Sequence, residues 1–87
     1  SQVIDRANKV VQQIAEAESF LRQAGFPIVR VRHHGNLARI EIPPAQLTQL
    51  LSCRDAVAIH FKQIGFRHIT LDLQGYRLGS FNEGLLS

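Results

Sequence analysis

Three arginines and one glutamate are spaced so that a β-hairpin would place them on a single face. Arg30 and Arg32 precede a Gly35-Asn36 pair, and Arg39 and Glu41 follow it. Gly and Asn tolerate the positive φ of two-residue hairpin turns, so the pair predicts a register in which Arg30 faces Glu41 and Arg32 faces Arg39. Guanidinium groups bind carboxylates and phosphates through charge-assisted hydrogen bonds. The pattern therefore predicts an anion-binding surface, the alternative being an ordinary solvated face of a small sheet.

The histidines and the single cysteine are the other side chains that could do chemistry: His33, His34, His60, His68 and Cys53. Neighbouring strand histidines point to opposite faces and the other two lie on separate elements, so a structural or surface role is favoured over a zinc site. The cysteine falls at a predicted helix start, on the apolar face and without a partner base, which favours a packed thiol. No phosphate-binding loop, nucleophile elbow or HExxH motif occurs. We predict no metal site and no catalytic residue in this chain.

Length and composition indicate one small globular domain. The 87 residues are 45% hydrophobic and 20% charged, which argues against wholesale disorder. Ten basic against seven acidic residues give a net charge of +3, a mild excess that favours anionic partners such as phosphates, nucleotides or RNA. One cysteine forms no internal disulfide, and no apolar stretch has transmembrane length. We expect a cytoplasmic protein.

Hydrophobic periodicity predicts the elements that position these residues. Apolar residues at spacings of three and four indicate one long amphipathic helix, which suits packing on a sheet better than a coiled coil because the stripe is short and rich in alanine. Ser52 with Asp55 resembles a capping box that opens a later helix. The predicted elements are a helix over 3–24, a hairpin over 28–42, a short helix over 44–51, a helix over 53–64, a strand over 69–73 and a short segment over 76–78.

A weak internal repeat with a period of 40 residues joins these elements. Gln23, Gly25, Phe26 and Gly35 recur as Gln63, Gly65, Phe66 and Gly75. The repeat predicts two α-β-β units that share one small, mainly antiparallel sheet with helices on one face, an α+β fold in two layers. It also places Thr70 and Asp72 on the face that carries the arginines.

The last motif places Tyr76 and Arg77 between Gly75 and Gly79. Glycines on both sides let the backbone turn tightly around them. We weigh two roles for this segment equally: Arg77 contacts a ligand or a second subunit, or the segment only leads into a short terminal helix.

Three segments together, over residues 17–26, 29–41 and 70–80, resemble one family. The chain combines Arg-x-Arg and Ala-Arg-Ile-Glu with a later Leu-Asp-Leu and Gly-Tyr-Arg, in the same order. It is similar to the C-terminal domain of the ATP-dependent sacrificial sulfur transferases (LarE type), which are PP-loop ATP pyrophosphatases that make the nickel-pincer nucleotide cofactor. The resemblance covers almost the whole chain.

The resemblance implies that residues 1–87 are a single C-terminal domain of a larger protein. The family's N-terminal PP-loop domain binds ATP with Mg and adenylylates a carboxylate of a pyridinium dicarboxylate mononucleotide. A donor cysteine, or in some members an iron–sulfur cluster, then supplies sulfur. The loop and the segment of the donor are missing from this chain, and Cys53 lies outside the matched motifs. The domain itself is expected to be inactive, with no cofactor of its own.

The family positions that match Glu18, Arg30, Arg32 and Glu41 border the substrate and phosphate region or the contacts between subunits. The resemblance thus implies three partners: the parent's PP-loop domain, an anionic mononucleotide and further copies of the chain in trimers or hexamers. Together with the hairpin and repeat, it gives these candidate substrate- and phosphate-binding residues: Arg30, Arg32, Glu41, Glu18, Arg39, Asp72 and Arg77.

Two other functions fit the same arginines. A small α+β RNA-binding module would use them on phosphates, although the chain lacks a GxxG loop and has few aromatic residues to stack bases. A pure oligomerisation domain would instead place them against acidic residues of a neighbouring subunit.

Overall fold

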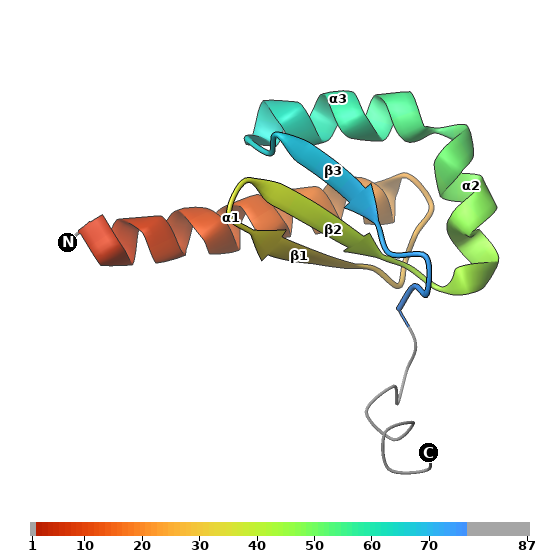
Figure 1. Cartoon of the computed structure of the whole chain (residues 1–87), viewed down its shortest axis with the longest axis horizontal. Helices are drawn as coiled ribbons and strands as arrows, with labels where there is room; N and C mark the ends of the chain where they lie inside the picture. Colours follow the sequence, from red (N-terminus) through yellow and green to blue (C-terminus); the bar gives the residue numbers. More distant parts are fainter. Residues whose placement is uncertain (1, 77–87) are drawn as a thin grey trace, which may run out of the picture.

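The computed structural model describes residues 2–76. Within them the chain forms α1 (Gln2–Gln23), β1 (Arg30–His34), β2 (Leu37–Glu41), a 3₁₀ turn η1 (Pro44–Gln46), α2 (Leu47–Ser52), α3 (Arg54–Ile64) and β3 (His68–Leu71) (Figure 1). This small α+β arrangement of helices on one sheet is the predicted fold class. None of the helices in the described part is long and apolar enough to cross a membrane.

The hairpin has the predicted register. Arg30 pairs with Glu41 and Arg32 with Arg39 across the antiparallel β1 and β2 strands. Gly35 supplies the one positive φ of the turn, +62°, and Asn36 keeps a negative φ. The two-residue turn therefore fixes which side chains share a face.

The third strand runs parallel to β2, so the sheet is mixed with the order β1-β2-β3. The prediction of a mainly antiparallel sheet is wrong in this respect. The chain leaves the end of β2, returns through η1, α2 and α3, and enters β3 in the direction of β2, as a crossover connection requires. Of the predicted short segment after β3, only Tyr76 lies within the described residues; its backbone N–H donates to the carbonyl of Ile42 at 2.8 Å.

The repeated Gly-Phe pairs end α1 and α3 in the same way. The amide of Phe26 donates to Leu21 and that of Phe66 to Phe61, at 3.0 and 3.1 Å, and the preceding glycine amides bond one turn back. This is the hydrogen-bond pattern of a Schellman motif. Both phenylalanines are buried, so the repeat corresponds to two equivalent helix ends that enter the core.

The predicted capping box does not form. The Ser52 hydroxyl donates to the carbonyl of Gln49 at 2.6 Å, and Cys53, which precedes α3, makes no side-chain cap. Ser52 belongs to the last turn of α2, where a hydroxyl bonds back to the helix carbonyls.

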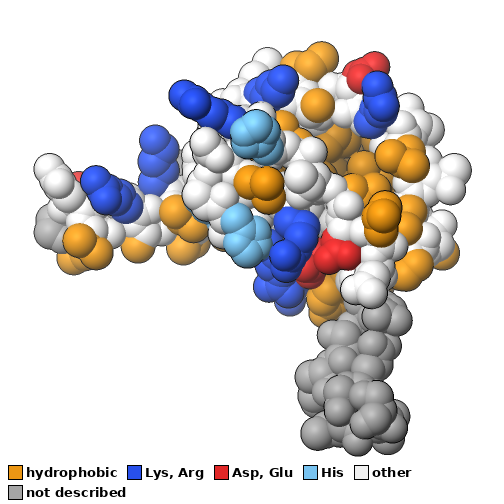
Figure 2. All heavy atoms as spheres, viewed as in Figure 1, with side chains coloured by type: hydrophobic (Ala, Val, Ile, Leu, Met, Phe, Trp, Pro, Cys, Tyr) orange, Lys and Arg blue, Asp and Glu red, His pale blue; other side chains and the backbone are white. Residues whose placement is uncertain are grey.

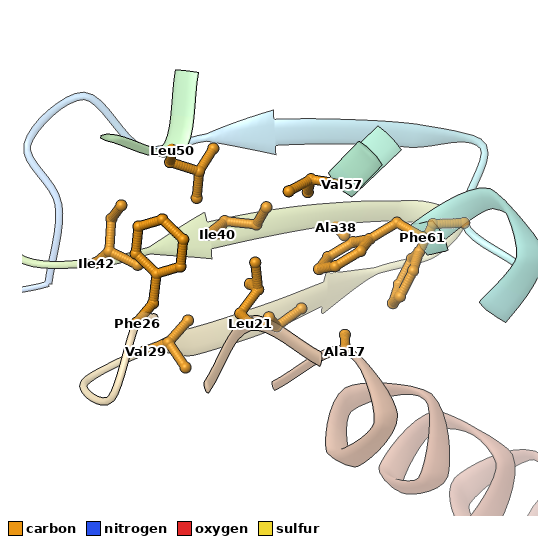
Figure 3. Packing of buried hydrophobic residues seen from close by; sticks show 12 residues of the cluster. Ala17, Leu21, Phe26, Val29, Ala38, Ile40, Ile42, Leu50, Val57 and Phe61 are labelled. Atoms are coloured by element: carbon orange, nitrogen blue, oxygen red, sulfur yellow. The ribbon is translucent and has the colours of Figure 1, made fainter. Parts of the chain in front are cut away.

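The core lies between the sheet and the helices on one of its faces. Figure 3 shows Ala17 and Leu21 from α1 and Val57 and Phe61 from α3 directed at Ala38 and Ile40 of β2. Apolar residues that alternate with the arginines along the strands are thereby buried, as predicted. The arginines lie on the opposite face.

The two halves of α1 differ in their surroundings. Of the residues in the predicted stripe, Ala17 and Leu21 are fully buried, whereas Val3 is 76% exposed and Ala7 is also exposed. In Figure 1 the N-terminal half of the helix extends beyond the hairpin turn. The apolar stripe read from the sequence is therefore only half covered by the described part of the chain.

Candidate functional site

The uncovered sheet face carries Arg30, Arg32 and Arg39 with Glu41 and Asp72, and we call these five residues the arginine face. Glu41 lies between two of the arginines. Arg32 Nε donates to its Oε1 at 3.1 Å, and Arg39 donates to its Oε2 through Nε and Nη2, at 3.2 and 3.0 Å. The Glu41 side chain is only 11% exposed, so one shielded carboxylate orients two guanidiniums that face each other across the strands.

Arg30 lies opposite Glu41 in the strand register but does not bond to its carboxylate. Its guanidinium lies over the ring of Tyr76, 5.9 Å from the centroid, within the range of a cation–π contact. The prediction of Arg30 beside Glu41 thus holds for the backbone, while the ion pairs run to Arg32 and Arg39. The sequence pattern singled out Tyr76 without indicating that it is the contact of Arg30.

Asp72 joins this face through the parallel strand pair, as the repeat predicted. Its Oδ2 is 3.7 Å from Arg39 Nε, and its Oδ1 accepts the backbone N–H of Gln74 at 2.9 Å. Thr70 lies beside Arg39 in the register, and its hydroxyl donates to the carbonyl of Ala38. Three guanidiniums against two carboxylates leave the face with one net positive charge.

Glu18 lies apart from the arginine face, on α1. Its carboxylate is buried and accepts the backbone N–H of Val31 at 3.0 Å, while Arg22 donates to its other oxygen at 3.3 Å. Val31 belongs to an edge strand, and its N–H points away from β2. Glu18 therefore joins the long helix to the edge of the sheet, a structural contact between distant elements that no local sequence pattern indicated.

An open groove of about 750 Å³ runs between α1 and β1 beside the arginine face. All three arginines, Glu18 and Tyr76 line it, together with Val10 and Ile14 of α1. Glu18 and the three arginines thus line the same groove. Arg77, the remaining candidate, lies outside the described residues.

Two of the histidines and the cysteine pack against other elements, whereas His34 and His68 are exposed on the surface. The His33 ring is 3.0 Å from the side-chain oxygen of Gln13, and the His60 ring stacks on Phe20 with centroids 3.9 Å apart. Cys53 Sγ lies 3.4 Å from the carbonyl of Leu50. Within residues 2–76 no three His, Cys, Asp or Glu side chains gather in a way that could hold a metal ion.

Comparison with known proteins finds relatives that share the sequence of this chain over part of their length. No protein-family model matches the chain. The chain is 45% identical over 75 residues to the pyridinium-3,5-bisthiocarboxylic acid mononucleotide synthase of Lactiplantibacillus plantarum, a match that covers 86% of this chain and 27% of the relative. It is 44% identical over 78 residues to an uncharacterized protein of Synechocystis sp., covering 86% of this chain and 29% of that protein.

A more distant relative, an uncharacterized protein of Methanocaldococcus jannaschii, is 34% identical over 67 residues, which are 77% of this chain and 26% of the relative. The chain spans about a quarter of the length of each of these proteins. Over that segment the comparison confirms the resemblance to the LarE-type family that the motifs indicated.

Proposed function

We propose that this chain is the substrate-binding and assembly domain of an ATP-dependent sulfur transferase of nickel-pincer cofactor biosynthesis. Its ligand is an anionic pyridinium mononucleotide, held by the arginine face. The relative from Lactiplantibacillus plantarum is named as a synthase of such a mononucleotide, which supports this ligand class. Because the chain spans about a quarter of that relative, the remaining functions belong to the rest of a longer parent.

The observation that carries the proposal is the clamp of Arg32, Glu41 and Arg39. Arg32 donates to the Glu41 carboxylate through Nε alone, and Arg39 donates to it through Nε and Nη2. Both side chains remain about half exposed, at 48% and 41%. Each guanidinium has five N–H donors in a fixed plane, so donors remain on both for a phosphate or carboxylate. Glu41 fixes the two planes in advance, which lowers the entropy lost on binding.

Arg30 adds a third cation to the clamp. Among residues 2–76 it forms no ion pair with a carboxylate, and its guanidinium carbon lies 5.9 Å from the centroid of the Tyr76 ring. Arg30 also lines the groove that the other two arginines share. A phosphate bound there would meet three guanidiniums that can each donate two hydrogen bonds.

The parent's chemistry lies elsewhere in this proposal. The 87 residues contain no phosphate-binding loop, so the PP-loop domain of the parent binds ATP and Mg and activates the substrate carboxylate. Cys53 packs between α2 and α3 and is not a sulfur donor. The domain contributes binding and assembly with further copies in a cytoplasmic enzyme.

Calorimetric titration of the chain with a pyridinium carboxylate mononucleotide tests the ligand class. The control ligand is the corresponding nucleoside, which lacks the phosphate. A mixed-sequence single-stranded RNA tests the alternative of an RNA-binding module. We expect saturable mononucleotide binding that weakens roughly ten- to a hundredfold without the phosphate. Equal affinity for nucleoside and mononucleotide, or tighter binding of the RNA, would contradict the proposal.

A further inference from the structure

The two edges of the sheet are protected very differently. At the β1 edge, Glu18 accepts the outward N–H of Val31, and α1 lies alongside the strand. The β3 edge has no such cover within the described residues. Its strand, His68–Leu71, contains no proline, lysine or bulge, which are the usual devices that keep an edge strand from pairing.

Alternate residues of β3 direct their backbone groups outward from the edge of the sheet. The amides of His68 and Asp72 donate toward β2, to the carbonyls of Asn36 and Ile40. Backbone groups alternate sides along a strand, so the N–H and C=O groups of Ile69 and Leu71 point away from β2. Within residues 2–76 no hydrogen-bond partner lies opposite them. The edge is thus a ready template for one more strand.

An apolar hollow of about 300 Å³ lies beside the same edge, between β3 and the helices α2 and α3. Figure 2 shows it as a recess lined with hydrophobic side chains. Leu51 at its rim is 56% exposed, and Ala58 of α3 and Thr70 of β3 both line it. Exposed apolar surface next to unpaired backbone groups is typical of an interaction site.

We propose that the occupant of this edge is the β3 strand of a second copy of the chain, paired antiparallel about a two-fold axis at Thr70. The two sheets then become one continuous six-stranded sheet. Ile69 lies opposite the partner's Leu71, and both residues present outward N–H and C=O groups, so the pair exchanges two hydrogen bonds. The symmetry repeats this pair on the other side of the axis, which satisfies every outward backbone group of both strands.

The side chains of the polar face favour this register. On the polar face, His68 lies opposite the partner's Asp72, and Thr70 lies opposite the partner's Thr70. Cross-strand pairs of Thr with Thr, and of a carboxylate with a hydrogen-bond donor, are favourable. If the two-fold axis lay at Ile69 or at Leu71, that residue would pair only with its own copy in the partner strand. Such registers would also lose the contact between His68 and the partner's Asp72. The strand is self-complementary in one register, as an isologous interface requires.

The helix layer is compatible with the same axis. Ala58 of α3 lines the hollow together with Thr70 of β3, and its small side chain leaves room for the α3 helix of the second copy. Asp55, near the start of α3, and Lys62, near its end, are both exposed. Antiparallel α3 helices bring each Asp55 toward the partner's Lys62. The exposed rim of the hollow is thereby covered.

The test is the mass of the chain in solution as a function of concentration, by sedimentation equilibrium. We expect the wild-type chain to dimerise and His68→Asp, which places a carboxylate against the partner's Asp72 twice, to weaken the dimer roughly tenfold or more. His68→Lys keeps a hydrogen-bond donor opposite the partner's Asp72 and should retain the dimer. His34→Asp is the matched control, because His34 is also exposed but lies on the β1 edge.

A cysteine at the axis tests the register. In an antiparallel pair without hydrogen bonds the Cα atoms are about 4.5 Å apart, close enough for a disulfide. In a Cys53→Ser background, Thr70→Cys should form a disulfide-linked dimer under mild oxidation, and Thr48→Cys on α2 should not. A chain that stays monomeric at every soluble concentration, a dimer that His68→Asp does not weaken, or a Thr70→Cys thiol that does not cross-link would overturn the proposal. None of these variants alters a residue of the arginine face, so loss of the dimer leaves the proposed nucleotide site to be tested separately.

Discussion

A single shielded carboxylate organises the cationic side chains of this domain. The hairpin register places Arg32 directly opposite Arg39, an arrangement that is repulsive on its own. Glu41 follows Arg39 by two residues on the same face and reaches both guanidiniums, one with each oxygen. The shared carboxylate thus offsets the repulsion between the two guanidiniums, and their remaining N–H donors are free to bind an anion. Glu41 is in this account a positioning residue for the two arginines.

Glu41→Gln should destabilise the fold by about 1–2 kcal/mol, because it leaves two facing guanidiniums without the charge that holds them. The measurement is the free energy of unfolding in urea. Glu16→Gln is the control, since Glu16 is exposed on α1 and forms no ion pair within residues 2–76. We expect no measurable change there. Equal effects of the two substitutions would argue against the clamp.

Glu18 has a different, testable role at the edge of the sheet. Glu18→Ala leaves the Val31 N–H without its acceptor, which should cost about 1–3 kcal/mol and accelerate hydrogen exchange of that amide. Glu18→Gln keeps a carbonyl acceptor and should restore part of the protection. Glu16→Ala, on the exposed side of α1, is the control. Unchanged exchange at Val31 in Glu18→Ala would show that the carboxylate is not its hydrogen-bond partner in solution.

At the residue scale, the sequence predicted which side chains share a face but not which of them bond. Alternation and a two-residue turn determine the face and the register of Arg30, Arg32 and Arg39. Glu41 bonds to Arg32 and not to Arg30 because of the directions in which the side chains leave the strands. The contact of Arg30 with Tyr76 depends on a turn that lies 46 residues later in the chain. Such long-range contacts have no signature in local periodicity.

At the scale of elements, the hairpin and the helix ends were predictable because their determinants are local. Gly-Phe pairs and the Gly35-Asn36 turn act within a few residues. The orientation of β3 was not, because it depends on how many helical segments return the chain across the sheet. Only the core face of β3, with Ile69 and Leu71, followed from alternation.

Two glycines with positive φ should respond differently to alanine. Gly75 has φ +74°, and a Cβ there would meet the carbonyl oxygen of Ile42 and the ring of Pro44. Gly35 has φ +62° with open space around it. We expect Gly75→Ala to destabilise the fold by about 3 kcal/mol or more and Gly35→Ala by about 1 kcal/mol. Similar midpoints of urea unfolding for the two variants would contradict the close approach at Gly75.

At the scale of the whole molecule, the domain presents surfaces that it does not fill itself. The arginine face, the β3 edge and the N-terminal half of α1 are all uncovered within residues 2–76. The chain spans about a quarter of the length of its relatives. The core, by contrast, is closed and lacks unsatisfied buried side-chain polar atoms in the described part.

This division of labour predicts that the chain does not process ATP. The 87 residues contain no loop that could cradle its phosphates. We expect no ATP-dependent release of pyrophosphate by the purified chain, with or without Mg and the mononucleotide, in a coupled phosphate assay. Pyrophosphate release that co-purifies with the chain and continues over many turnovers would contradict this prediction, because it would require an ATP site within the domain.

The most direct test of the arginine face as an anion site is the mononucleotide affinity of four chains, measured by calorimetry: wild type, Arg32→Ala, Arg32→Lys and Arg54→Ala. Arg54 is a matched control because its side chain is 78% exposed on α3, away from the clamp. We predict that Arg32→Ala loses ~1.5–3 kcal/mol, roughly ten- to a hundredfold in affinity, that lysine recovers part of it, and that Arg54→Ala binds like wild type. Unchanged affinity in Arg32→Ala, or a loss that appears only because the oligomer dissociates, would contradict the account.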